Sequence, residues 1–136
     1  MPYKQFEHTA DIGLEAWGDN LEKAFQEAAK GMFDVFTDID TVEPREKHEI
    51  KAASDSLETL LVDFLSEFVF MFEVKSMLFC EFQVRIQESK EFTLEAVCRG
   101  EEIDLDKHPL DTAIKAVSYH EILVDREGKI RVIFDV

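Results

Sequence analysis

The chain has 136 residues, of which 46% are hydrophobic and 11% aromatic. A single domain usually has about 100 to 200 residues, and this apolar content is enough to fill a buried core. We therefore expect one compact domain over residues 1–136, and a mainly disordered chain is excluded.

The chain is strongly acidic. It has 15 Lys and Arg against 30 Asp and Glu, a formal net charge of −15. Such a surface repels phosphates, so we expect no strong binding of nucleic acid by the protein alone. An acidic surface favours cations and basic protein partners, although the same charge also serves plain solubility or adaptation to salt or heat.

Compartment and redox state follow from what the sequence lacks. No stretch approaches the roughly 20 apolar residues that span a bilayer, and residues 1–8 lack the hydrophobic segment of a signal peptide. We expect a soluble cytoplasmic protein. Its two cysteines, Cys80 and Cys98, are too few for a disulfide framework or a Cys-rich zinc site, so we expect reduced thiols in the core.

The first elements expected in chain order are a strand and a helix. Apolar residues alternate with other residues over 12–16, which predicts a half-buried strand. Over 21–36 they recur every three or four positions, which predicts an amphipathic helix. Asp19 or Asn20 can cap the exposed amides of its first turn.

A second helix is expected after a short strand that ends at 50–52. In this helix Asp55 can act as the cap and Glu58 can reach back to it, as in a capping box. The apolar stripe runs over 57–72, and residues 68–72 are apolar on all sides. We therefore expect the last turn to be covered on more than one side, as in a central helix.

The clearest hairpin joins two runs, 78–86 and 92–98, in each of which the apolar residues that alternate along the strand have even numbers: Leu78, Cys80, Phe82, Val84 and Ile86, and Phe92, Leu94, Ala96 and Cys98. An even register, such as Gln87 opposite Glu91, pairs the two apolar faces. That register also places the two cysteines opposite each other. A cross-strand disulfide is then conceivable, but two packed thiols are the preferred interpretation in a reducing compartment.

The rest of the chain continues the β pattern. A polar loop around 107–109 is followed by β-like runs over 116–119, 122–125 and 130–134. The sequence therefore predicts an α+β domain in which two amphipathic helices pack with mainly antiparallel sheets of about six to seven strands.

The common catalytic signatures are missing from this sequence. It has no Gly-rich phosphate loop, no Gly-x-Ser-x-Gly elbow, no His-Glu-x-x-His and no Cys-x-x-Cys. Its four histidines have no metal-ligand spacing and are interpreted as surface or hydrogen-bonding residues. No enzyme class is indicated.

Carboxylates at the C-terminal end of the chain are candidate metal ligands. Asp135 precedes Val136, whose α-carboxylate would repel it unless a cation or several donors lie between them. Oxygen ligands of this kind suit hard cations such as Ca²⁺ or Mg²⁺. The alternative is a C-terminus that is frayed and solvated.

Near the N-terminus, Asp11 is the last residue of a polar cluster that could be an ordinary turn. Lys115 begins a predicted strand, where a lysine is usually solvated.

Seven short motifs follow one another along nearly the whole chain: His8-Thr9-Ala10-Asp11, Ala16-Trp17-Gly18-Asp19, Thr41-Val42-Glu43-Pro44, Leu60-Leu61-x-x-Phe64-Leu65-x-Glu67, Lys107-His108-Pro109, Ile114-Lys115-Ala116-Val117-x-Tyr119 and Phe134-Asp135-Val136. Singly each motif is weak. In this order and at this spacing they resemble the archease family.

The resemblance implies a small accessory protein of the RtcB-type RNA ligase. This ligase joins RNA ends that bear a 2′,3′-cyclic phosphate or 3′-phosphate to 5′-hydroxyl ends, using GTP and Mn²⁺, notably in tRNA splicing. The resemblance implies that the protein is not itself an enzyme and promotes guanylylation and repeated turnover of the ligase. The alternative is a chaperone that binds proteins or tRNA and has no role in ligase activation.

The resemblance also assigns residues. It implies a calcium-type metal site, for Ca²⁺ or another hard divalent cation such as Mg²⁺ or Mn²⁺, formed by Asp11, Asp135 and Val136. It places Lys115 next to that site, in an accessory role near the active site of the partner.

Overall fold

The computed structural model describes residues 2–8 and 11–136. In chain order its elements are β1 (Tyr3–His8), β2 (Asp11–Trp17), α1 (Leu21–Phe36), the short 3₁₀ helix η1 (Ile39–Thr41), β3 (Glu46–Ser54), α2 (Leu57–Lys75), β4 (Met77–Glu88), β5 (Phe92–Glu102), β6 (Ala116–Asp125) and β7 (Lys129–Asp135).

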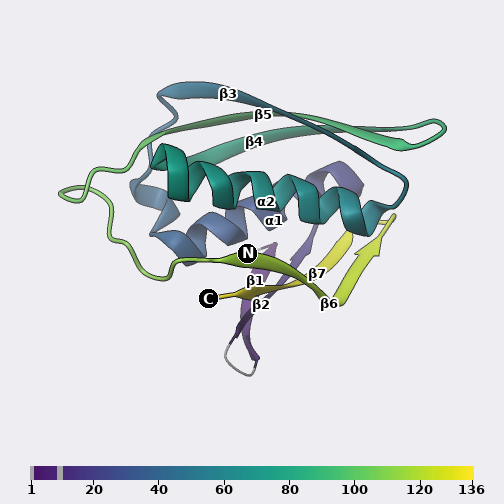
Figure 1. The fold of residues 1–136 in the computed structure, drawn as a ribbon, viewed down its shortest axis with the longest axis horizontal. Helices are drawn as coiled ribbons and strands as arrows, with labels where there is room; N and C mark the ends of the chain where they lie inside the picture. Colours follow the sequence, from purple (N-terminus) through teal and green to yellow (C-terminus); the bar gives the residue numbers. More distant parts are fainter. Residues whose placement is uncertain (1, 9–10) are drawn as a thin grey trace.

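The strands form two antiparallel sheets with the two helices between them (Figure 1). One sheet has four strands in the order β1-β2-β7-β6, and the other has three in the order β3-β5-β4. The α+β prediction with two helices and mainly antiparallel sheets is confirmed. No helix in the described part of the chain is both long and apolar enough to cross a membrane.

The helix starts show how local sequence fixes an element. The side chain of Asn20 accepts a hydrogen bond of 2.9 Å from the backbone N–H of Lys23, so Asn20 caps α1. The capping box predicted for α2 is wrong. Ser56 caps that helix by accepting from the N–H of Thr59, and Glu58 is only the second helical residue, too early in the helix for that role.

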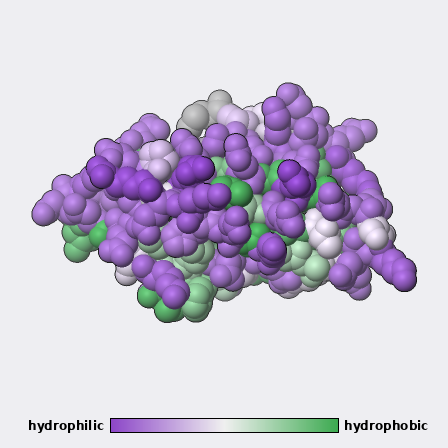
Figure 2. Space-filling view, turned by 90° about the horizontal axis from the view of Figure 1, so that it is seen from above, coloured by the Kyte–Doolittle hydropathy of each residue, from purple (hydrophilic) through white to green (hydrophobic). Residues whose placement is uncertain are grey.

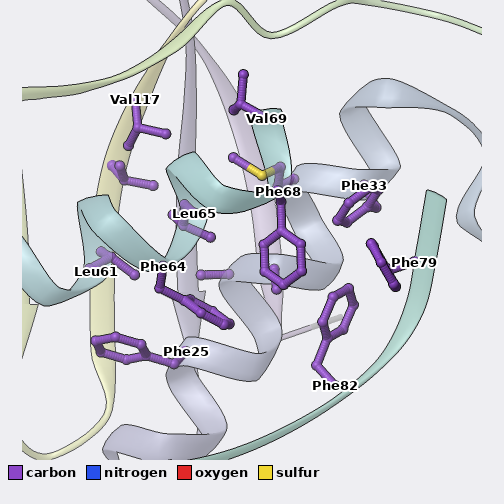
Figure 3. Packing of buried hydrophobic residues seen from close by; sticks show 14 of the residues in the cluster. Phe25, Phe33, Leu61, Phe64, Leu65, Phe68, Val69, Phe79, Phe82 and Val117 are labelled. Atoms are coloured by element: carbon purple, nitrogen blue, oxygen red, sulfur yellow. The ribbon is translucent and has the colours of Figure 1, made fainter. Parts of the chain in front are cut away.

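Aromatic side chains from both helices and from β4 fill the space between the two sheets (Figure 3). The ring centre of Phe33 lies 5.4 Å from that of Phe68 and 5.7 Å from that of Phe79. Near the end of α2, Phe68 and Val69 are both buried, so this turn is covered on more than one side as predicted. Phe70, at 47% exposure, marks its solvent side.

The predicted hairpin of β4 and β5 forms, but the expected register is wrong. Glu88 lies opposite Phe92, and Cys98 lies opposite Phe82 instead of Cys80. Even parity decides which face is buried but leaves the pairing free to shift by two residues. The ladder also has an irregularity between Phe79 and Glu81, so Cys80 has no cross-strand partner.

Both cysteines are free thiols, as preferred from the sequence. Burial raises the pKa of Cys98 to about 12 and that of Cys80 to about 11, which keeps both thiols protonated at neutral pH. Gly100 lies at the same irregularity. A Cβ atom at this position would clash with the backbone carbonyl of Leu78, so this close approach of two strands requires glycine.

Two strand predictions need correction. The runs over 116–119 and 122–125 belong to one strand, β6, with an irregularity between Ser118 and Leu123. In addition β1 was not predicted. Its two large apolar residues point to opposite faces of the sheet: Tyr3 is buried toward α1, and the ring of Phe6 lies over Gly13. The alternation that identifies half-buried strands is therefore missing from β1.

Candidate functional site

The two ends of the chain meet in the four-stranded sheet. Strands β2 and β7 are neighbours and antiparallel, and Asp11 lies directly opposite Asp135. Residues opposite each other in such a pair have Cβ atoms about 4.5–5.5 Å apart on the same face of the sheet. Two acidic residues separated by 124 positions in the sequence are thus cross-strand neighbours.

Strand β6 brings Lys115 to the same place. Ala116, its first residue, lies opposite Asp135 on the other side of β7. The backbone N–H of Lys115 donates a hydrogen bond of 2.8 Å to the carbonyl oxygen of Asp135. We call Asp11, Lys115, Asp135 and Val136 the strand-end site. Asp11 is half-buried, and the other three are exposed.

The face on which the two aspartates lie follows from the strand alternation. Leu14 of β2 and Phe134 and Val132 of β7 are fully buried against the helices. Asp11 and Asp135 have the other parity, so they lie on the outer face of the four-stranded sheet. In the described part of the chain, no helix or strand lies over this face (Figure 1). Asp135 is exposed there, and Asp11 is half-buried.

Phe6 packs on the outer face of this sheet. Its ring lies on Gly13, where any Cβ atom would clash with it. The guanidinium carbon of Arg131 lies 4.2 Å from the centre of the same ring, and Nη1 of Arg131 is 3.1 Å from Oε1 of Glu15. Gly13 therefore allows an aromatic side chain of β1 to close over β2 two residues from Asp11.

The chemistry of the strand-end site is that of oxygen donors. Its side-chain carboxylates, Asp11 and Asp135, are oxygen donors of the kind that hard divalent cations such as Ca²⁺ prefer, at distances of about 2.3–2.6 Å. The described residues contain no group of three or more His, Cys, Asp or Glu able to hold a metal. A cation here would therefore need main-chain oxygen or water beside the two aspartates. Thr9 and Ala10 of the first motif lie outside the described residues.

A second charged site was not predicted from the sequence. Glu101, near the end of β5, is only 8% exposed, and its carboxylate accepts hydrogen bonds from the backbone N–H of Glu43 at 2.8 Å and from Nζ of Lys107 at 2.7 Å. Nε of Arg45 lies 3.2 Å away, and Nε2 of His108 lies 3.0 Å away. We call these five residues the Glu101 cluster.

The tautomer of His108 follows from its partners. Its Nδ1 accepts a hydrogen bond of 2.9 Å from the backbone N–H of Asp104, so Nε2 carries the proton and donates to Glu101. Burial by itself raises the pKa of Glu101, but the hydrogen bonds from Lys107, the N–H of Glu43 and His108 outweigh it and lower this pKa to about 2. Glu101 is therefore a carboxylate at any physiological pH.

The Glu101 cluster gives two of the sequence motifs a structural role. Glu43 belongs to the motif over residues 41–44, and His108 to the motif over 107–109, and the two meet at Glu101. The interpretation of His108 as a hydrogen-bonding residue is confirmed. No spacing in the sequence could have shown that Glu101 joins them, because the three segments come together only in the folded chain.

The fold and the strand-end site define a class of small α+β proteins in which two antiparallel sheets enclose two helices, and strands from near the two ends of the chain pair at the centre of one sheet. A solved structure of this class is the solution structure of protein 1598 from Methanobacterium thermoautotrophicum. It superposes with a TM-score of 0.83 at 33% sequence identity, and the match covers 99% of each chain.

Sequence comparison agrees with the structural match. The model of the archease protein family matches residues 3–136. The protein archease of Methanopyrus kandleri is 44% identical over 128 residues, with 93% of this chain and 91% of the relative covered. That of Sulfurisphaera tokodaii is 42% identical over 126 residues, with 93% and 90% covered. The chain belongs to the archease family.

Proposed function

We propose that this protein is a cytoplasmic, non-catalytic activator of an RtcB-type RNA ligase. In this proposal it promotes guanylylation of the ligase and its repeated turnover in tRNA splicing or RNA repair. The observation that carries the proposal is the pairing of Asp11 with Asp135 beside Lys115, since these are the residues that the family resemblance assigns to the functional site.

The charge of the strand-end site fits a role at a partner's nucleotide and metal site. The site combines up to three carboxylates with one lysine, and the whole chain has a formal net charge of −15. An acidic site of this kind is attracted to the cationic cleft in which an enzyme binds nucleotide phosphates. The antiparallel register orders the backbone of the strand-end site before the partner binds, which lowers the entropy lost on binding.

Each residue of the strand-end site has a proposed task. Asp11, Asp135 and the α-carboxylate of Val136 would hold the divalent cation, and Lys115 would present its ammonium group to phosphate oxygens of the bound nucleotide. A divalent ion in this position supplies positive charge that stabilises phosphate oxygens. The backbone hydrogen bond from Lys115 to Asp135 holds the backbone of the lysine at the site, and the residue is exposed.

The test measures ligation by the cognate ligase with GTP and Mn²⁺, counted as products per ligase molecule, together with guanylylation of the ligase. Asp11→Asn, Asp135→Asn and Lys115→Ala should each lower turnover by about tenfold or more, the usual size for loss of a group at a metal site. Asp63→Asn and Lys51→Ala, at exposed positions on α2 and β3, are matched controls and should have no effect.

Two further results bear on the proposal. Addition of one residue after Val136 displaces the α-carboxylate without altering a side chain, so it should also lower turnover. Unchanged turnover in all the site variants would refute the assignment. Tight, salt-sensitive binding of tRNA by the protein without the ligase would instead favour the chaperone alternative.

A further inference from the structure

The connection between β5 and β6, residues 103–115, ends at the strand-end site and begins at the Glu101 cluster. It contains no helix or long strand, yet its backbone is attached to the rest of the fold along most of its length. Near its start the N–H of Ile103 donates to the carbonyl oxygen of Ser76 at 2.8 Å. The side chain of His108 is then held between the N–H of Asp104 and the carboxylate of Glu101.

The next attachments are to the end of α1. The hydroxyl of Thr37, a buried residue, donates to the carbonyl oxygen of Pro109 at 2.5 Å. The N–H of Asp111 donates to the carbonyl oxygen of Phe36 at 2.9 Å. Ile114 is then fully buried, and Lys115 donates to Asp135. The connection therefore follows one path from Glu101 to Lys115.

Glu101 joins the start of this path to the body of the protein through side chains, in addition to the backbone attachments. It receives donors from the connection, through Lys107 and His108, and from the segment before β3, through the N–H of Glu43 and the side chain of Arg45. A buried carboxylate with four donors has a narrow choice of geometry, because each donor left unpaired there costs free energy. An apolar side chain at the same place could fill the space without fixing the direction of the connection.

We propose that Glu101 is a positioning residue for the strand-end site. It fixes the start of the 103–115 connection so that Lys115 arrives beside Asp135 in a single arrangement. Its effect on the ligase, which rests on the proposed function, is transmitted through Lys115, since Glu101 itself is buried within its own cluster.

The first measurement needs no ligase. In Glu101→Gln the carbonyl oxygen can replace Oε2, which accepts from Glu43, Lys107 and His108, but the negative charge is lost and the NH₂ group faces Arg45 in place of the acceptor Oε1. Amide hydrogen exchange, followed residue by residue by NMR, should then be faster by about tenfold or more at Lys115 and along 103–115, the size expected for loss of charge-assisted hydrogen bonds. Glu88→Gln, which removes an exposed ion pair with Arg126, is the matched control and should leave exchange at Lys115 unchanged.

The second measurement uses the ligase and a double-mutant cycle. Glu101→Gln should lower turnover in the wild-type background and should add nothing in the Lys115→Ala background, because Glu101 acts through Lys115. A purely structural role would give additive losses instead. Lys107→Ala, which leaves three donors on Glu101, keeps the test open if Glu101→Gln does not fold, and it should show the same pattern with smaller effects.

The two measurements separate the two proposals. Unchanged exchange at Lys115 in a folded Glu101→Gln or Lys107→Ala variant would overturn the positioning role, whatever the ligase does. Faster exchange at Lys115 combined with full turnover in Lys115→Ala would support the positioning role and refute the proposed function of the site.

Discussion

The Glu101 cluster and the strand-end site both bring together carboxylates from segments far apart in the chain, but different forces hold them. In the Glu101 cluster, the carboxylates of Glu43 and Glu101 are matched by Arg45 and Lys107, and His108 adds a neutral donor. In the strand-end site, two aspartates and one lysine are brought together by backbone register and a backbone hydrogen bond.

This difference separates a cluster whose charges are paired from one with an excess of negative charge. The Glu101 cluster satisfies its own charges around the buried Glu101 and His108, so it needs nothing from outside. The strand-end site has an excess of negative charge on an open face, which is the arrangement that a cation or a basic partner can complete. The free energy of unfolding tests the structural role of the Glu101 cluster, and the response to cations tests binding at the strand-end site.

The largest expected effect is on the Glu101 cluster. In His108→Ala the N–H of Asp104 loses its acceptor and the carboxylate of Glu101 loses one of its donors. A cavity also replaces the side chain of a residue that is only 1% exposed. The free energy of unfolding should fall by about 3 kcal/mol. Urea unfolding followed by circular dichroism measures it. Lys107→Ala should cost clearly less, because Lys107 is partly exposed, and equal losses would contradict the central role of His108.

The next largest effect is a response of the strand-end site to divalent cations. A site that binds Ca²⁺ in the folded state only should raise the free energy of unfolding by about 2.7 kcal/mol at a free concentration of 100 times its dissociation constant. Calorimetry with and without Ca²⁺ measures this. Asp135→Asn should abolish the increase and His108→Ala should retain it. An increase that survives in Asp135→Asn would place the cation elsewhere.

Gly13→Ala should destabilise the sheet that carries the strand-end site. The new methyl group would clash with the ring of Phe6 and drive it away from Arg131. Overpacking of this kind costs about 1–3 kcal/mol. Thermal unfolding measures the loss. In a Phe6→Ala background the same substitution should cost much less, and equal cost in both backgrounds would show that the ring is not the cause.

Acid should weaken the Glu101 cluster. The pKa of Glu101 is about 2 in the folded protein, below its ordinary value of 4.5, so Glu101 contributes stability above about pH 4.5 that is lost as the pH falls through 2. The difference in unfolding free energy between the wild type and Glu101→Gln should therefore shrink between pH 5 and pH 2, by the linkage of protonation to folding. A difference that stays constant over this range would contradict the lowered pKa.

The smallest effect is expected from Asp135→Asn in the absence of divalent cations. Asp135 is exposed, and the substitution removes one charge from an acidic cluster without altering the backbone hydrogen bond that its carbonyl oxygen accepts from Lys115. The free energy of unfolding should change by less than about 0.5 kcal/mol. Urea unfolding in the presence of a chelator checks this, and a loss as large as that of His108→Ala would show that the two sites do not differ as described.

The surface of the molecule agrees with this division between buried and open charge. Seen from above, over the three-stranded sheet, it is mostly hydrophilic with a few apolar spots (Figure 2). The outward residues of β4 and β5 include Glu81, Arg85, Glu95 and Arg99, in which both signs alternate. Mixed charge of this kind keeps a sheet face soluble without directing it to a partner of one sign.

The sequence by itself determined the helices, the face of each strong strand and the α+β class, because periodicity and capping are local properties. It indicated Asp135 and Val136 as candidate cation ligands, whereas roles for Asp11 and Lys115 came only from the family motifs. It missed β1, in which Tyr3 and Phe6 point to opposite faces, and it misplaced the register of β4 and β5, since a shift of two residues preserves parity.

Only the tertiary structure decided which distant residues meet. The pairing of β2 with β7 made neighbours of Asp11 and Asp135. Packing of the 103–115 connection against α1 brought Lys115 to the same end of β7. The meeting of Glu43, Glu101 and His108 likewise depends on the positions of three separate segments. Such contacts depend on how whole elements pack, and a local pattern of residues contains no record of that packing.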